Sequence, residues 1–174
     1  MFTIETVPWG KVKLFHDKWR NYDITVQTYG LNIDKVFVDL DSILYEDVGF
    51  MEPPKDKTLG FYQDGILRGT CQIKNISEGI SNRYPKLSGI ANMAIDPAYR
   101  NNGIGTWLMR VTDLYISNNK FNLSVLYPSL YSQQIDFYSK FGYMPYGKVM
   151  IKSYGTNNIS KKDLDKYIEQ IGKF

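Results

Sequence analysis

The chain has 174 residues, 43% of them hydrophobic and 22% charged, which suits a globular protein with a buried core. Its net charge of +3 is small and its basic residues are dispersed, which argues against a nucleic-acid-binding surface. A single Cys excludes an internal disulfide and a cysteine-rich zinc site, and a single His argues against a histidine-based metal site.

The first part of the chain predicts a strand followed by two helices. Residues 2–7 are expected to form the strand, and Pro8 suits the first turn of a helix with apolar residues at helical spacing up to Trp19. His16 in this helix has two interpretations, a surface residue or a substrate contact. A second helix is expected over about 33–47, where apolar residues recur with a period of 3.6.

A hairpin and a buried strand follow. The strand-like runs 58–63 and 66–74 flank Asp64-Gly65, a dipeptide that favours a tight hairpin turn. After a loop rich in Gly, Ser, Asn and Pro, residues 87–95 read as a buried strand, which Asp96-Pro97 ends.

The second half alternates helices and strands. The clearest helical stripe runs from Ile104 to Tyr115, and Asn118-Asn119 is expected to end that helix. Further elements are expected at 121–127 (strand), 132–141 (helix, capped by Gly142), 145–153 (strand) and from Ser160 on (helix). This order predicts an α/β fold with a mixed sheet, in a single domain over 1–174.

Residues 100–105, Arg-Asn-Asn-Gly-Ile-Gly, join the buried strand to the helical stripe and form the predicted binding site. A helix N-terminus presents unpaired N–H groups and roughly half a positive charge. Gly103 and Gly105 remove side chains where a phosphate would approach, and Gly permits the positive φ of an anion-binding nest. Arg100 adds a fixed charge. We therefore expect these amides to bind the pyrophosphate of a cofactor.

Two other phosphate-binding motifs do not match. A P-loop requires Lys after its second glycine, where this chain has Thr106. A Rossmann fingerprint requires a third glycine, where this chain has Leu108, and it follows a first strand rather than a late one. An ordinary Gly-containing loop stays an alternative for Gly-x-Gly alone, but the flanking strand, break and helix favour the phosphate site.

The stretch from Met93 to Leu108 resembles the acetyl-CoA motif of the GNAT N-acetyltransferases, Arg/Gln-x-x-Gly-x-Gly/Ala after a β-strand. Residues 137–143, Phe-Tyr-Ser-Lys-Phe-Gly-Tyr, are similar to the closing Tyr-x-x-x-Gly-Phe/Tyr signature of that family. The resemblance covers about 87–150, and the element order extends it to the preceding hairpin and helices. It implies a mostly antiparallel mixed sheet flanked by helices, and metal-free acetyl transfer from acetyl-CoA to a primary amine by direct attack in a ternary complex.

The resemblance also implies the residues of the site. The backbone of Met93 and Ile95 would pair with the pantetheine arm, and the loop with Thr106 would hold the pyrophosphate. The implied cofactor-binding residues are Met93, Ala94, Ile95, Arg100, Asn101, Asn102, Gly103, Ile104, Gly105 and Thr106. Tyr138 is the implied catalytic residue near the thioester sulfur, because a phenol of pKa about 10 can protonate a thiolate of pKa about 8.5. A core aromatic is the alternative interpretation of Tyr138.

The general base and the acceptor stay open. An alkylamine must lose a proton before it attacks, but strand 87–95 contains no carboxylate. Glu78 is one candidate base, with a solvated loop charge as the alternative. Acidic residues between Asp34 and Asp56, especially Asp39 and Asp47, would attract a cationic small molecule or a protein amine. The solvated face of an amphipathic helix is the alternative there.

Location, assembly and two rival functions complete the expectations. The N-terminus lacks the pattern of a signal peptide and no run of about 18 apolar residues exists, so we expect a cytoplasmic protein without a membrane span. The aromatic content of 15% is compatible with a homodimer. One rival is a non-catalytic acyl-CoA-binding or regulatory module, favoured by the missing carboxylate and opposed by Tyr138. The other is an acyltransferase with a longer acyl donor or with an RNA or protein acceptor.

Overall fold

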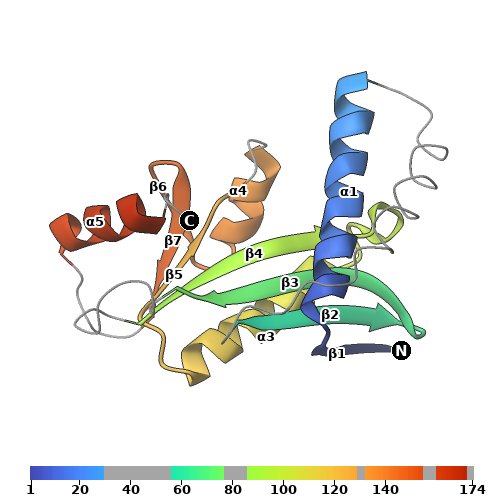
Figure 1. Cartoon of the computed structure of the whole chain (residues 1–174), viewed down its shortest axis with the longest axis horizontal. Coiled ribbons are helices and arrows are strands. Elements are labelled where there is room, and N and C mark those ends of the chain that lie inside the picture. The colour runs from blue at the N-terminus through green and yellow to red at the C-terminus, as the bar shows by residue number, and fades with distance from the viewer. Residues whose placement is uncertain (30–55, 77–85, 129–131, 155–159, 172–174) are drawn as a thin grey trace. The chain divides into compact units, whose positions relative to one another are not determined.

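The computed structural model describes residues 1–29, 56–76, 86–128, 132–154 and 160–171 (Figure 1). The predicted helix over 33–47 lies outside these residues. The elements of the described part, in chain order, are β1 (Phe2–Thr6), α1 (Trp9–Tyr29), β2 (Lys57–Gln63), β3 (Ile66–Asn75), β4 (Leu87–Ile95), a 3₁₀ turn (Pro97–Tyr99), α3 (Ile104–Asn118), β5 (Leu123–Leu126), α4 (Ser132–Ser139), β6 (Met144–Tyr146), β7 (Val149–Ser153) and α5 (Lys161–Ile171).

The strands form one mixed sheet with the order β1-β2-β3-β4-β5-β7-β6. β4 and β5 are parallel, whereas the pairs β1–β2, β2–β3, β5–β7 and β6–β7 are antiparallel. The prediction of an α/β fold with a mixed, mostly antiparallel sheet and flanking helices is therefore confirmed.

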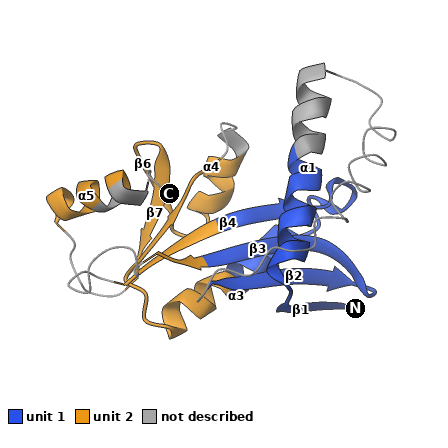
Figure 2. Ribbon diagram, viewed as in Figure 1, with its two compact units in different colours: residues 1–73, 91–111 blue, residues 74–90, 112–174 orange. Residues whose placement is uncertain are grey.

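The chain divides into two compact units (Figure 2). Unit 1 comprises residues 1–73 and 91–111, and unit 2 comprises residues 74–90 and 112–174. The sheet strands β3 and β4 and the helix α3 each contribute residues to both units. The assignment of 1–174 to a single domain stays a prediction.

Unit 1 is built on the predicted β2–β3 hairpin. Asp64 and Gly65 form its turn with φ values of 51° and 78°, the left-handed conformations that a two-residue type I′ turn requires. Gly69 brings α3 close to this hairpin, because a Cβ at position 69 would lie 2.8 Å from Ile104 Cγ2 and 3.1 Å from Leu108 Cδ1. The hairpin face that carries Gly69 therefore packs on the start of α3.

The N-terminal strand and helix are tied to the same hairpin. The Val7 amide donates to the Thr58 carbonyl at 3.1 Å, and the Thr58 hydroxyl donates to the Val7 carbonyl. Pro8 directly precedes α1, and its carbonyl accepts from the amides of Lys11 and Val12 in the first turn of the helix. Val12 is fully buried, so it anchors the helix.

Unit 2 differs from expectation in its last strands. The single strand predicted over 145–153 is two strands, β6 and β7, which reverse direction around Gly147 at φ +59°. A left-handed residue interrupts the extended backbone there, so the chain folds back on itself. The strand predicted over 121–127 shortens to β5. The unit's apolar core contains Leu87, Leu123, Val125 and Val149.

Gly142 ends α4 in the predicted way. It has φ +89°, its amide donates to the Ser139 carbonyl at 3.1 Å, and the Tyr143 amide donates to the Tyr138 carbonyl at 3.4 Å. These two bonds are those of a Schellman motif with glycine in the left-handed position. The helix itself stops at Ser139, two residues before the predicted end.

We predict that Gly142→Ala lowers the free energy of unfolding by about 1 kcal/mol, because Ala is disfavoured at positive φ. The nearest side chain to a Cβ at this position is the flexible end of Lys152, at 3.3 Å, so packing adds little to the loss. Gly142→Asn is the matched control, because Asn tolerates this conformation and should lose less stability. Urea unfolding of both variants measures the difference, and equal losses would contradict the assignment.

Candidate functional site

The segment between β4 and α3 is anchored at its start by Asp96. The Asp96 amide donates to the Arg68 carbonyl at 2.8 Å, and its carboxylate accepts from the Ala98 amide at 3.1 Å. The other carboxylate oxygen pairs with Arg68 Nη1 at 2.8 Å. Asp96 therefore ends the strand, as predicted, and also fixes the 3₁₀ turn that leads into the loop.

The loop itself presents a row of unpaired amides. Asn101 and Gly103 adopt left-handed φ values of 63° and 85°, and α3 begins at Ile104. The first helical bond runs from the Trp107 amide to the Gly103 carbonyl at 3.0 Å. Among the described residues none accepts a hydrogen bond from the N–H groups of residues 101–106. Six successive donors at a helix N-terminus are an arrangement that suits an anion.

Space and charge around the loop suit a phosphate group. A Cβ built at Gly103 would meet no atom within 4 Å, so the loop is open at this position. Arg100 supplies a positive charge beside the helix N-terminus, where the dipole also favours an anion. The residues of the loop therefore fit the predicted phosphate ligand.

Arg100 and Asn102 also brace the loop, which the sequence did not indicate. Arg100 Nε donates to the Ile95 carbonyl at 3.1 Å. Asn102 Nδ2 donates to the carbonyls of Tyr99 and Arg100, both at 3.3 Å. The loop is thus held from both sides, and one lone pair of the Ile95 carbonyl is already engaged.

The strand residues of the predicted site, Met93, Ala94 and Ile95, form the end of β4. The parallel ladder with β5 joins 87–90 to 123–126 and includes no residue of 91–95 in the described chain. The backbone of Met93 and Ile95 therefore lies beyond that ladder. An extended ligand that adds to a strand needs such an edge.

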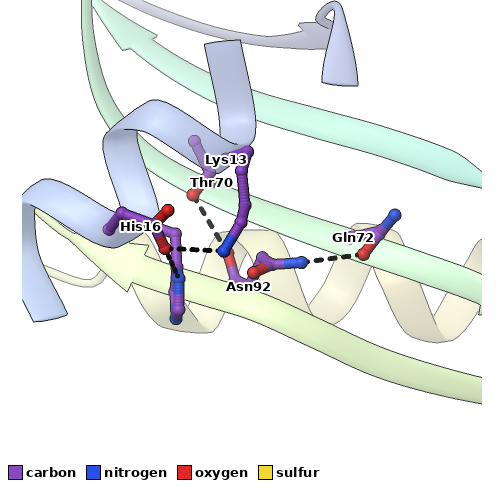
Figure 3. Close-up of polar contacts among 6 residues, drawn as sticks. Lys13, His16, Thr70, Gln72 and Asn92 are labelled. Atoms are coloured by element: carbon purple, nitrogen blue, oxygen red, sulfur yellow. Dashed lines mark hydrogen bonds and ion pairs between the residues drawn. The ribbon is translucent and has the colours of Figure 1, made fainter. Parts of the chain in front are cut away.

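A partly buried polar network that includes Asn92 was missed by the sequence analysis, and Figure 3 shows its residues Thr70, Gln72 and Asn92. Asn92 has φ 51°, a left-handed residue inside a strand, and its carbonyl accepts from Thr70 Oγ1 at 3.1 Å. Asn92 Nδ2 donates to Gln72 Oε1 at 2.8 Å, and Gln72 Nε2 donates to Asp56 Oδ2 at 3.2 Å. The signal in the sequence is an Asn within an apolar strand, and two polar residues spaced by two in β3.

The carboxylate at the end of this network fixes both amide orientations. Asp56 only accepts, so Gln72 must turn its NH₂ toward Asp56 and its oxygen toward Asn92. Asn92 must then donate, which leaves its own Oδ1 without a donor among the described residues. The network therefore offers one oriented acceptor on β4.

His16 and its neighbours on α1 form a second polar group, also drawn in Figure 3. His16 Nδ1 lies 3.2 Å from Asp17 Oδ1, which also accepts from Lys13 Nζ at 2.8 Å. The side chain of His16 is 20% exposed, so its ring is partly buried, and its role as a surface residue or a substrate contact stays open. Burial lowers the pKa of His16, and the opposing effect of Asp17 is smaller.

Tyr138 lies in unit 2 and is 7% exposed. Its ring packs edge-to-face on Phe137 and Tyr143, at centroid distances of 5.1 and 6.3 Å. The Tyr143 hydroxyl, in turn, donates to Ser124 Oγ at 2.8 Å. This environment matches the core-aromatic interpretation, and the catalytic role of Tyr138 stays a prediction.

Other expectations fall outside the described residues. Glu78, Asp34, Asp39 and Asp47 belong to the segments 30–55 and 77–85, and only Asp56 of the acidic group is described. Within the described ranges no group of three or more His, Cys, Asp or Glu residues is arranged to hold a metal ion. None of the described helices has the length and apolar character needed to cross a membrane.

Comparison with known protein families gives one match. The model of the family described as "Acetyltransferase (GNAT) domain" matches residues 55–145, which include β2 to β4, the loop, α3 and α4. Among curated proteins no significantly similar sequence is found.

Solved structures share the fold at low sequence identity. The PaiA N-acetyltransferase of Thermoplasma acidophilum, in complex with coenzyme A, aligns with a TM-score of 0.59 and 16% identity over 88% of this chain and 99% of its own. A GNAT acetyltransferase of Brucella melitensis, in complex with acetyl-CoA, aligns with a TM-score of 0.57 and 15% identity over 92% of each chain. A ribosomal-protein-alanine N-acetyltransferase of Escherichia coli aligns with a TM-score of 0.56 and 13% identity over 92% of this chain and 99% of its own.

The buried imidazole predicts a pH dependence of stability. Because the folded pKa of His16 lies below its unfolded value, the unfolded chain binds a proton first as the pH falls. The stabilisation that neutral His16 adds to the free energy of unfolding is therefore complete above the unfolded pKa of about 6.5. It is lost as the pH falls toward the folded pKa.

We expect the wild-type protein to lose more stability than His16→Gln between about pH 7 and 5, in urea unfolding at both pH values. The variant removes the titration but leaves all other acid-sensitive groups in place. Parallel losses in the two proteins would show that His16 is not buried in its neutral form.

Proposed function

Because the chain belongs to the GNAT acetyltransferase family, we propose that it transfers an acetyl group from acetyl-CoA to a primary amine by direct attack in a ternary complex. The observation that carries the proposal is the row of unpaired N–H groups over residues 101–106, at the N-terminus of α3. A pyrophosphate supplies acceptors for several such donors at once.

In this proposal acetyl-CoA supplies an acetyl thioester that is activated toward amines. The amides of residues 101–106 and the Arg100 charge hold its pyrophosphate. The backbone of Met93 and Ile95 pairs with the pantetheine arm, since the β4–β5 ladder does not include these residues. Arg100 therefore has two roles, a counter-charge and the brace that donates to the Ile95 carbonyl.

Asn92 is proposed to orient the attacking amine. Its Oδ1 is the acceptor that the Asp56–Gln72–Asn92 network leaves over, and it lies on the same strand as Met93. A neutral amine donates one N–H to this oxygen and keeps its lone pair for the acetyl carbon. Binding the neutral form matters, because an alkylamine with pKa about 10.4 is mostly charged at neutral pH.

Tyr138 is proposed to donate its phenolic proton to the departing thiolate. The amine lone pair forms the new C–N bond, and the C–S bond breaks as the sulfur takes up the phenolic proton. The nitrogen then loses one proton, which returns through solvent to the Tyr138 phenolate. A phenol with the ordinary pKa of about 10 carries its proton at neutral pH, so this proton is present when the thiolate departs. The two-motif resemblance supports this role.

The similar structures support the donor and leave the acceptor open. Two of them contain coenzyme A or acetyl-CoA, whereas the ribosomal-protein-alanine enzyme acts on a protein amine. Their identity to this chain is 16% or less, so the acceptor is proposed only as a small-molecule or protein primary amine.

Acetyl-CoA should raise the melting temperature by about 5–10 °C at a hundredfold excess over its Kd, through mass action. Gly103→Val should abolish this shift, because a branched side chain would occupy the open space above the loop amides. Gly147→Val is the matched control. It also has positive φ and no atom within 4 Å of a Cβ, but it lies in the β6–β7 turn, so it should keep the shift.

Loss of the shift in both variants, or in neither, would contradict the loop assignment. A wild-type protein that binds acetyl-CoA but releases no thiol with any amine of a broad panel would be the non-catalytic binding module instead. Thiol release on such a panel therefore separates an enzyme from a binding protein.

Tyr138→Phe should lower kcat about tenfold or more, with little change in the Kd of acetyl-CoA, because only the proton donor is lost. Tyr143→Phe is the matched control, a neighbouring buried tyrosine whose hydroxyl donates to Ser124. It should cost about 1 kcal/mol of stability and leave kcat unchanged. If the two variants have equal kcat values, Tyr138 has no role in proton transfer.

A further inference from the structure

A cleft in unit 1 is not used by the proposed acetyl-transfer steps. It is lined by α1 and by the β2–β3 hairpin, and its volume of about 390 Å³ lies within the range of about 300–1,000 Å³ that is usual for small-molecule sites. Leu14, Phe15 and Leu67 supply apolar walls, and Asp96 belongs to the lining at the end of β4. The cleft thus begins one residue beyond the strand that carries Asn92.

Positive side chains dominate the cleft. Lys11, Lys18 and Arg68 line it, against a single carboxylate, that of Asp96. Asp96 is already engaged, since one oxygen pairs with Arg68 and the other accepts from a backbone amide. An apolar cleft with an excess of cations favours an anionic ligand.

Aromatic rings hold two of these cations in place. Lys11 Nζ lies 5.3 Å from the centroid of the Tyr62 ring, and the Arg68 guanidinium lies 4.0 Å from that of Tyr99. Ring contacts of this kind orient a cation without neutralising it. Among the described residues Lys11 has no carboxylate within ion-pair distance. Its charge is therefore available to a ligand.

We propose that this cleft binds a carboxylate or phosphate group carried by the amine acceptor. The inference rests on the proposed acetyl transfer and narrows its acceptor to amines that also bear an acid group on an apolar chain. Asp96 follows Asn92 by four positions, and four steps of strand span roughly 13 Å, which is the separation expected between the amine and the acid. Short α-amino acids do not span this separation.

Direct binding tests the cleft without any transfer reaction. Phenylacetate should bind about tenfold more tightly than phenylacetamide, its neutral analogue of the same shape, in calorimetric or NMR titrations. Phenyl phosphate should behave like phenylacetate. Lys11→Gln should weaken phenylacetate binding at least about threefold, and added salt should weaken it in the wild type.

Lys13→Gln is the matched control. It removes the same charge from the same helix, but Lys13 pairs with Asp17 and does not line the cleft, so phenylacetate affinity should be unchanged. Gly103→Val should also retain phenylacetate binding, which separates this cleft from the phosphate loop. Equal binding of phenylacetate and phenylacetamide, or equal effects of the two lysine variants, would overturn the anion site.

Kinetics test the link to the acceptor. Straight-chain ω-aminocarboxylates that span the expected separation should have kcat/KM values about tenfold above those of alkylamines of equal length. Lys11→Gln should remove this preference and leave alkylamine turnover unchanged, and phenylacetate should compete with the aminocarboxylate. If phenylacetate inhibits the reaction without raising the KM of the aminocarboxylate, it is a separate regulatory ligand, and the acceptor assignment is overturned.

The two proposals fail in different ways. If the protein binds phenylacetate selectively but releases no thiol from acetyl-CoA, the anion site is supported and the acetyl-transfer proposal is contradicted. If the protein acetylates alkylamines and aminocarboxylates equally well, the acetyl-transfer proposal is supported and the inference about the cleft is contradicted.

Discussion

The amides at the start of α3 are the feature on which the rest of the candidate site depends. A row of unpaired N–H groups is stable only where an anion or water can reach it, so the loop must be both rigid and open. Rigidity comes from Asp96 and Arg100, which tie the 3₁₀ turn and the loop to β3 and β4. Openness comes from Gly103, whose missing side chain leaves free space above the amides.

The hairpin strand β3 supports this arrangement through both of its faces. On one face Gly69 lets Ile104 and Leu108 of α3 approach the sheet, which fixes the position of the helix N-terminus. On the other face Thr70 and Gln72 hold Asn92 in its left-handed conformation through two hydrogen bonds. The pleat of one strand therefore positions both the loop of residues 100–105 and the Asn92 amide.

The charge differs among three parts of the candidate site. The loop of residues 100–105 presents backbone dipoles and the Arg100 charge. The β4 network presents neutral amides and ends in one carboxylate. The α1 cleft presents Lys11 and Lys18, while its Arg68 pairs with Asp96. Neutral amides suit an uncharged amine, whereas a carboxylate in their place would hold the ammonium form. The cations of the α1 cleft suit an acid group on the same acceptor.

Local patterns in the sequence determined the strand β4, the hairpin turn at Asp64-Gly65, the glycine cap at position 142 and the Gly-containing loop before α3. Each depends on a few neighbouring residues with special φ values or periodicity. The division of 145–153 into two strands was missed, because a single left-handed residue, Gly147, causes it. Only the tertiary structure joined Asp56, Gln72 and Asn92 into one network, or placed Lys11 beside the β2–β3 hairpin. These contacts link residues far apart in the chain, and no local periodicity encodes which strand or helix will lie next to another.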